Sequence, residues 1–200
     1  MNIAVFCSGR GTNLQAIIDE MKSGRIRAKI ALVVSDEKNA FAITRAKEAG
    51  IETLVLDPKK FKTREDFDKE AIKHLKKRDV GLVVLAGYMR LLSGHFVKEY
   101  KDRIMNIHPA LLPSFKGVHG VKDALEYGAK VTGATVHFVD EKLDHGPIIM
   151  QSAVEVKDDD TEETLLDRNH KEEYKIYPEA IRLFVEGRIV VEGRRVRISL

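Results

Sequence analysis

The sequence contains a single cysteine, Cys7, among its 200 residues. One cysteine excludes an internal disulfide, and its place in the apolar run Ile3 to Cys7 favours a small buried side chain over a nucleophile. Long hydrophobic runs are also missing. The longest, from Val80 to Met89, contains two glycines and falls short of the roughly 20 apolar residues that a membrane-spanning helix needs. The sequence therefore predicts a protein that neither relies on disulfides nor crosses a membrane.

An excess of charge of one sign is missing as well. The 34 Lys and Arg residues are interspersed with 31 Asp and Glu residues, so the net charge is only +3 and no basic stripe indicates a nucleic-acid partner. Met1-Asn2-Ile3 leads into a strand without the charged segment of a signal peptide, and we expect a cytoplasmic protein. Hydrophobic residues make up 44% and charged residues 32% of the chain, which is typical of one globular domain.

Apolar runs alternate with helical repeats along the chain. Continuous apolar runs are typical of strands buried on both faces, and their alternation with helices predicts an α/β fold with a doubly wound, mostly parallel sheet. Near the C-terminus the pattern predicts a long helix from Thr161 to about Gly187, which contains Pro178, and then a β-hairpin that turns at Glu192-Gly193. The strands are predicted at 3–7, 29–35, 52–56, 80–87, 104–108, 132–139 and 148–156.

A glycine-rich turn, Ser8-Gly9-Arg10-Gly11-Thr12-Asn13, lies between the first strand and the first helix. Free N–H groups and the helix dipole favour an anion there, so the turn is predicted to bind a phosphate. It lacks the Gly-Lys-Ser/Thr of a nucleotide-binding P-loop, and Leu14 stands where the dinucleotide fingerprint has its third glycine. An ordinary strand-to-helix turn is the alternative. Asp36, at the end of the second strand, fits either a ribose contact or a turn residue, and the sequence does not decide.

Asn106 and His108 are predicted to share one face of the strand Ile104 to His108, because side chains alternate along an extended chain. An imidazole exchanges protons near neutral pH and an amide N–H stabilises an oxyanion, so the pair suits addition to a carbonyl, as in acyl or formyl transfer. The alternative is a strand end whose polar groups only satisfy loop backbone. His119 and His137 are rivals for the catalytic role, but structural duties are favoured for both.

Five segments stand in order along the chain: Ser8-Gly9-Arg10-Gly11-Thr12-Asn13-Leu14-Gln15-Ala16-Ile17, Leu85-Ala86-Gly87-Tyr88-Met89-Arg90-Leu91-Leu92, Asn106-Ile107-His108-Pro109-Ala110-Leu111-Leu112-Pro113, Val136-His137-Phe138-Val139 and Leu143-Asp144-His145-Gly146-Pro147. Together they resemble one family, the folate-dependent phosphoribosylglycinamide formyltransferases, over essentially the whole chain. The resemblance implies a Rossmann-like formyltransferase fold over residues 1–200, with a phosphate-binding half at 1–100 and a catalytic and folate-binding half at 101–200.

The resemblance also implies an activity: transfer of a formyl group from 10-formyltetrahydrofolate, as co-substrate, to the amine of 5'-phosphoribosylglycinamide in purine biosynthesis. No metal is expected, and the protein would act as a monomer or homodimer. Asn106, His108 and Asp144 would be catalytic, with Asp144 favouring the charged form of His108. Gly11, Thr12 and Asn13 would hold the phosphate and Glu173 the sugar or glycinamide. The folate contacts would be Arg64, Met89, Arg90, Leu91, Leu92, Asp140, Glu141, Lys142 and Leu143.

Three positions depart from the family pattern: Ala110 replaces a common serine, Asn169 stands at a usually apolar helix position, and Tyr174 replaces a usual histidine. From the residues alone, the charge run Lys171-Glu172-Glu173 indicates a solvated helix face. Family analogy also suggests a cis Leu112-Pro113 bond. The alternative functions are a formyltetrahydrofolate hydrolase and a non-enzymatic phosphosugar-binding domain, whereas a transfer-RNA formyltransferase would need a C-terminal barrel for which the chain has no length.

Overall fold

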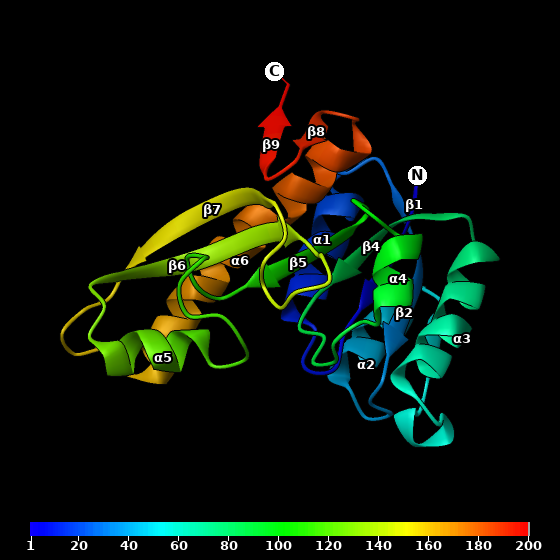
Figure 1. The fold of residues 1–200 in the computed structure, drawn as a ribbon, viewed down its shortest axis with the longest axis horizontal. Coiled ribbons are helices and arrows are strands. Elements are labelled where there is room, and N and C mark those ends of the chain that lie inside the picture. Colours follow the sequence, from blue (N-terminus) through cyan, green and yellow to red (C-terminus); the bar gives the residue numbers. More distant parts are fainter. Residues whose placement is uncertain (200) are drawn as a thin grey trace. The chain divides into compact units, whose positions relative to one another are not determined.

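In the computed structural model, which describes residues 1–199, the chain forms two compact units, Met1–Met105 and Asn106–Leu200. The first unit alternates strands and helices as the apolar pattern predicts (Figure 1). Its elements are β1 (Asn2–Phe6), α1 (Thr12–Lys22), β2 (Lys29–Ser35), α2 (Phe41–Glu48), β3 (Thr53–Val55), a short 3₁₀ turn (Pro58–Lys60), α3 (Arg64–Lys76), β4 (Val80–Leu85) and α4 (Gly94–Glu99).

The strands of the first unit lie in the order β3-β2-β1-β4, and every neighbouring pair is parallel. The chain moves outward from β1 to β2 and β3, then returns to place β4 on the other side of β1. Because such crossovers are right-handed, this reversal puts the helices before and after it on opposite faces of the sheet. Accordingly α1 contacts α2, and α3 contacts α4. The predicted doubly wound, mostly parallel sheet is confirmed.

Aromatic and aliphatic side chains fill the core of this unit. The Phe6 ring, at the end of β1, makes edge contacts with Tyr88 at 5.3 Å and with Phe96 at 5.8 Å between ring centroids. Cys7 is fully buried beside it, and burial raises the pKa of its thiol to about 12. The prediction that Cys7 is a small core residue is confirmed, because a thiol with so high a pKa is not a nucleophile at neutral pH.

The second unit begins within β5 (Ile104–His108), the strand on which the chain passes out of the first. Here β6 and β7 pair antiparallel, and α6 packs on both strands (Figure 1). Val121, Val154 and Leu165 form a small apolar core where α5 meets α6. The elements are α5 (Gly120–Tyr127), β6 (Val131–Phe138), β7 (Ile148–Glu155), α6 (Glu162–Val185), β8 (Ile189–Glu192) and β9 (Arg195–Ile198).

Several local predictions for this unit are confirmed. Thr161 caps α6 by accepting a hydrogen bond from the N–H of Thr164, and Pro178 lies inside that helix. The Leu112-Pro113 bond is cis. The hairpin forms, although its turn is at Gly193-Arg194, one residue later than predicted.

Among residues 1–199, no helix is long and apolar enough to span a membrane.

Candidate active site

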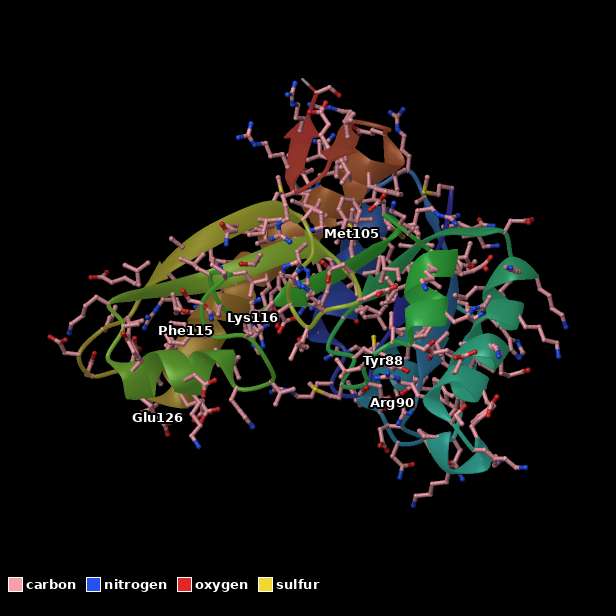
Figure 2. All side chains as sticks on the ribbon, in the orientation of Figure 1. Tyr88, Arg90, Met105, Phe115, Lys116 and Glu126 are labelled. Carbon is pink, nitrogen blue, oxygen red and sulfur yellow. The ribbon has the colours of Figure 1, made fainter. Side chains whose placement is uncertain are left out.

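The carboxyl ends of β1 and β4 mark the point where the strand order of the first unit reverses. In open α/β sheets ligands bind in the crevice outside such a point, so the loops that follow these two strands are the natural place for a site. One is the turn Ser8 to Asn13, and the other is the loop Gly87 to Leu92, which bears Tyr88 and Arg90 (Figure 2). Both were singled out from the sequence.

The turn leads into α1 through Gly11, whose φ of 70° lies in the left-handed region. A Cβ at this position would lie 2.7 Å from the Cα and Cβ of Ala42, so only glycine lets the turn approach α2 so closely. Gln15 N–H donates the first helical bond to the Gly11 carbonyl at 2.9 Å, while within residues 1–199 no side chain caps the helix. The turn thus leads directly into the N-terminus of α1, where the helix dipole favours an anion.

Two contacts from α2 hold the turn in place. The N–H of Ala42 donates to the Gly9 carbonyl at 3.1 Å. Arg45 donates through Nε to the Arg10 carbonyl at 2.9 Å, and its guanidinium lies over the Phe41 ring. The shape of the turn is therefore imposed by the neighbouring helix rather than by glycine alone.

The loop Gly87 to Leu92 exposes apolar side chains. Met89 is 68% exposed and Leu91 is 56% exposed, whereas Leu92 is half-buried. The Arg90 guanidinium lies 4.8 Å from the centroid of the Phe67 ring. Arg64, the first residue of α3, is exposed. Exposed apolar groups beside two arginines suit a flat ligand that carries carboxylates.

In the second unit, β5 ends at a cluster formed by Asn106, His108 and Asp144. His108 is 3% exposed, and its Nδ1 lies 3.5 Å from Oδ2 of Asp144, which is 8% exposed. Asp144 lies in the loop that follows β6. The φ of Asp144 is 44°, in the left-handed region of backbone conformations. The predicted catalytic residues are thus neighbours.

The loop between β5 and α5, which includes Phe115 (Figure 2), completes this cluster and was not anticipated from the sequence. The Phe115 carbonyl accepts a hydrogen bond from Nε2 of His108 at 2.7 Å, so that nitrogen carries a proton. The Gly117 N–H donates to Oδ2 of Asp144 at 2.8 Å. A Cβ on Gly120 would lie 3.1 Å from the Phe115 carbonyl oxygen and 3.3 Å from Nε2 of His108. Gly120 therefore leaves the room that the imidazole needs.

His137, on β6, is a second histidine that the fold brings to the cluster. Its Nδ1–H donates to the Phe138 carbonyl at 2.8 Å, which leaves Nε2 to accept from the Asn106 amide nitrogen at 3.2 Å. Burial lowers the pKa of His137, so the ring is neutral. The bond fixes the direction of the Asn106 amide. Sequence spacing did not reveal it, because the two residues are far apart along the chain and meet only across the strands.

The predicted folate segment Asp140 to Leu143 lies in the loop between β6 and β7. Asp140 accepts from the Lys142 N–H at 2.9 Å and from Nδ1 of His145 at 2.6 Å. Burial raises the pKa of Asp140, but these hydrogen bonds outweigh it and the pKa is lowered overall. Arg194, at the hairpin turn, donates to the His145 carbonyl. Glu141, Lys142 and Leu143 are exposed.

The burial of Glu173 corrects the prediction that the run Lys171-Glu172-Glu173 is a solvated helix face. The Glu173 side chain is only 4% exposed, so the run is not wholly solvated. The helical repeat explains the difference, because Glu173 lies four residues from both Asn169 and Tyr177, which are fully buried on the same side of α6.

Each of the three residues that depart from the family pattern contacts another group of the protein. Asn169 donates through Nδ2 to the Pro109 carbonyl at 3.1 Å, which ties α6 to the residue after His108. Ala110 is fully buried, and its carbonyl accepts a hydrogen bond from the Thr135 hydroxyl at 2.6 Å. The Tyr174 ring stacks on His170 with centroids 5.8 Å apart.

Among residues 1–199, no group of three or more His, Cys, Asp or Glu side chains is arranged to hold a metal ion.

Known proteins are similar to this chain in fold and in sequence. A formyl transferase family model matches residues 1–181. The phosphoribosylglycinamide formyltransferase of Escherichia coli is 44% identical over 94% of this chain and 89% of its own length. The crystal structure of glycinamide ribonucleotide transformylase 1 from Symbiobacterium toebii superimposes with a TM-score of 0.97 at 51% identity, over 99% of this chain and 93% of its own.

Larger proteins contain the same segment. The trifunctional purine biosynthetic protein adenosine-3 of Drosophila melanogaster is 45% identical over 94% of this chain. The chain spans only 14% of the length of that protein and 19% of its counterpart in Gallus gallus. The family model and the relatives of similar length agree with the resemblance found in the sequence, and the chain belongs to the formyl transferase family.

Proposed function

We propose that the protein transfers a formyl group from 10-formyltetrahydrofolate to the amine of 5'-phosphoribosylglycinamide, giving formylglycinamide ribonucleotide and tetrahydrofolate. The observation that carries this proposal is the cluster of Asn106, His108 and Asp144 at the end of β5, with His108 and Asp144 only 3.5 Å apart. The names of the relatives with similar length support the same reaction.

Asn106 and His108 supply the two functions that formyl transfer needs. When an amine adds to a formyl carbon, the formyl oxygen becomes an oxyanion, which a preorganised N–H donor stabilises. The amide nitrogen of Asn106 carries two hydrogens, of which His137 accepts one, and the second is directed to the oxyanion. His108 moves the proton from the attacking amine toward the leaving nitrogen of the folate.

Asp144 acts on His108 through its charge. Its carboxylate faces the His108 ring and stabilises the positive charge that develops there while the proton is moved. The Gly117 N–H holds the carboxylate in this position. Nε2 of His108 donates a hydrogen bond to the Phe115 carbonyl. This hydrogen bond must break before Nε2 can pass its proton to a ligand.

The two substrates bind through separate groups. Gly11, Thr12 and Asn13 hold the phosphate at the start of α1, where the helix dipole favours an anion. Glu173 binds the sugar or glycinamide part, for which a buried carboxylate is a strong hydrogen-bond acceptor. The folate contacts are Arg64, at the start of α3, and the loop residues Met89, Arg90, Leu91, Leu92, Asp140, Glu141, Lys142 and Leu143.

The reaction needs neither a metal nor a nucleic acid, and we place the enzyme in the cytoplasm as a monomer or homodimer. The test is to incubate the protein with 10-formyltetrahydrofolate and 5'-phosphoribosylglycinamide and to follow both products. Formation of tetrahydrofolate together with formylglycinamide ribonucleotide supports the proposal. Formate release without transfer would identify a hydrolase, and binding without turnover would identify a phosphosugar-binding domain.

A further inference from the structure

Ser8 joins the two loops that follow β1 and β4. Its N–H donates to the Gly87 carbonyl at 3.0 Å. Its hydroxyl oxygen accepts from the Met89 N–H, also at 3.0 Å. One residue of the glycine turn therefore makes a bond to each side of Tyr88 and sets the path of the chain where it leaves β4.

Asp36, which the sequence left between two roles, orients that hydroxyl. The Ser8 hydroxyl donates to Oδ1 of Asp36 at 2.6 Å, and Asp36 is buried at the end of β2. A hydroxyl has one hydrogen. Because the carboxylate takes that hydrogen, the lone pairs of the oxygen are free to accept from Met89. The short bond to a carboxylate is the stronger type, so it holds the hydroxyl in this orientation.

We propose that Ser8 is a positioning residue for folate binding, although it lies in the turn that we assign to the phosphate, and that Asp36 acts through it. The inference rests on the proposed function, since it assigns the loop Gly87 to Leu92 to the folate. Met89 starts the exposed apolar part of this loop, and the Ser8 hydroxyl fixes the backbone there. Asp36 is thereby a positioning residue and not a ribose contact.

Other contacts keep the loop in place when this hydroxyl is removed. The Tyr88 ring packs on Phe6, and at the far end of the loop the Ser93 N–H donates to Oδ2 of buried Asp68 at 2.6 Å. The backbone bond from Ser8 to Gly87 also survives replacement of the side chain. Ser8→Ala therefore leaves the fold intact and frees only the first exposed residues of the loop, so its effect is confined to ligand binding.

The experiment measures the dissociation constants of tetrahydrofolate and of 5'-phosphoribosylglycinamide by calorimetry. For Ser8→Ala we expect weaker folate binding by about fivefold, the scale of one lost hydrogen bond, with ribonucleotide binding changed less than about twofold. Ser23→Ala is the matched control, because the Ser23 hydroxyl also donates to one backbone carbonyl, that of Glu20, and accepts from one N–H, that of Arg25, away from both loops. It should change neither constant.

Asp36 variants test the orientation step. Asp36→Ala should weaken folate binding, and the double variant with Ser8→Ala should be no worse than Ser8→Ala alone, because both act through one hydroxyl. Asp36→Asn, which keeps an acceptor oxygen, should bind folate nearly as the wild type does. The inference is overturned if Ser8→Ala weakens both ligands equally, or if the Ser8 and Asp36 effects add. A wild type that binds both ligands without transfer would instead contradict the proposed reaction and leave this comparison of binding constants decisive.

Discussion

Oδ2 of Asp144 lies 3.5 Å from Nδ1 of His108, and the same oxygen accepts a hydrogen bond from the Gly117 N–H at 2.8 Å. The carboxylate is therefore held by the backbone of one loop while it faces the imidazole on β5. On the other side, its Oδ1 lies 3.7 Å from Nε2 of His137. One buried carboxylate thus faces two histidines.

Asp144→Asn keeps the size of the side chain and removes its charge. We expect turnover to fall about 100-fold, the scale of one general-acid or oxyanion contribution, with both Michaelis constants little changed. Steady-state kinetics with each substrate varied in turn provides the measurement. Asp158→Asn is the control, since Asp158 forms an exposed ion pair with Lys130. Near-normal turnover in Asp144→Asn would make Asp140 or Glu141 the next candidate.

Gly11→Ala should raise the Michaelis constant for the ribonucleotide by about tenfold or more, with a much smaller change for the folate, because the added Cβ displaces the turn that presents the N–H donors. Gly24→Ala is a matched control. Gly24 also has a positive φ, 81°, but a Cβ there meets no atom within 4 Å. It should share the backbone strain and keep both constants. Equal increases for both substrates in Gly11→Ala would locate the phosphate elsewhere.

Gly120→Ala should lower turnover with little change in substrate binding. The new Cβ presses on Nε2 of His108 and on the Phe115 carbonyl, and small displacements of a catalytic group are costly. We expect a loss of about tenfold in kcat. Gly128→Ala, at the other end of α5, serves as the control because a Cβ there has no neighbour within 4 Å. An unchanged kcat in Gly120→Ala would show that the His108 position tolerates this crowding.

His137→Gln should remove part of the pH dependence of stability. Burial lowers the pKa of His137 in the folded protein, whereas in the unfolded chain it is near the ordinary value of about 6.5. Below that pH the unfolded state binds the extra proton, so the free energy of unfolding falls by about 1.4 kcal/mol per pH unit until the folded pKa is reached. Above it, His137 contributes no slope.

Urea unfolding at pH 7.5 and at pH 5.5 checks this prediction. The difference in the free energy of unfolding between the two pH values should be smaller in His137→Gln than in the wild type. His119→Gln, at an exposed position before α5, should keep the wild-type difference. If His137→Gln also kept it, the buried ring would already be charged in the fold at the lower pH.

The sequence alone was sufficient for features that depend on near neighbours. The apolar run of β1 and the helical repeat after it predicted a strand, a turn and a helix, and the structure has all three in that order, with the strand at Asn2–Phe6 and not at 3–7. The long C-terminal helix was predicted from Thr161, and Thr161 caps α6 by accepting a hydrogen bond from the Thr164 N–H. These outcomes follow from steric and hydrogen-bonding preferences that act within a few residues. The alternation of Asn106 and His108 on one strand belongs to the same class.

Tertiary structure decided the features that join distant residues. Three hydrogen bonds of the site cannot be read from the local sequence of either partner. They join His108 to the Phe115 carbonyl, the Asn106 amide to His137, and the Ser8 hydroxyl to Asp36. Glu173 shows the same limit, because its burial depends on which face of α6 packs inward and not on its charged neighbours. Periodicity indicates which side of an element is buried. Which polar groups meet on that side depends on how whole strands and helices pack. This packing brings His108 and Asp144, which are far apart in the chain, together in one candidate site.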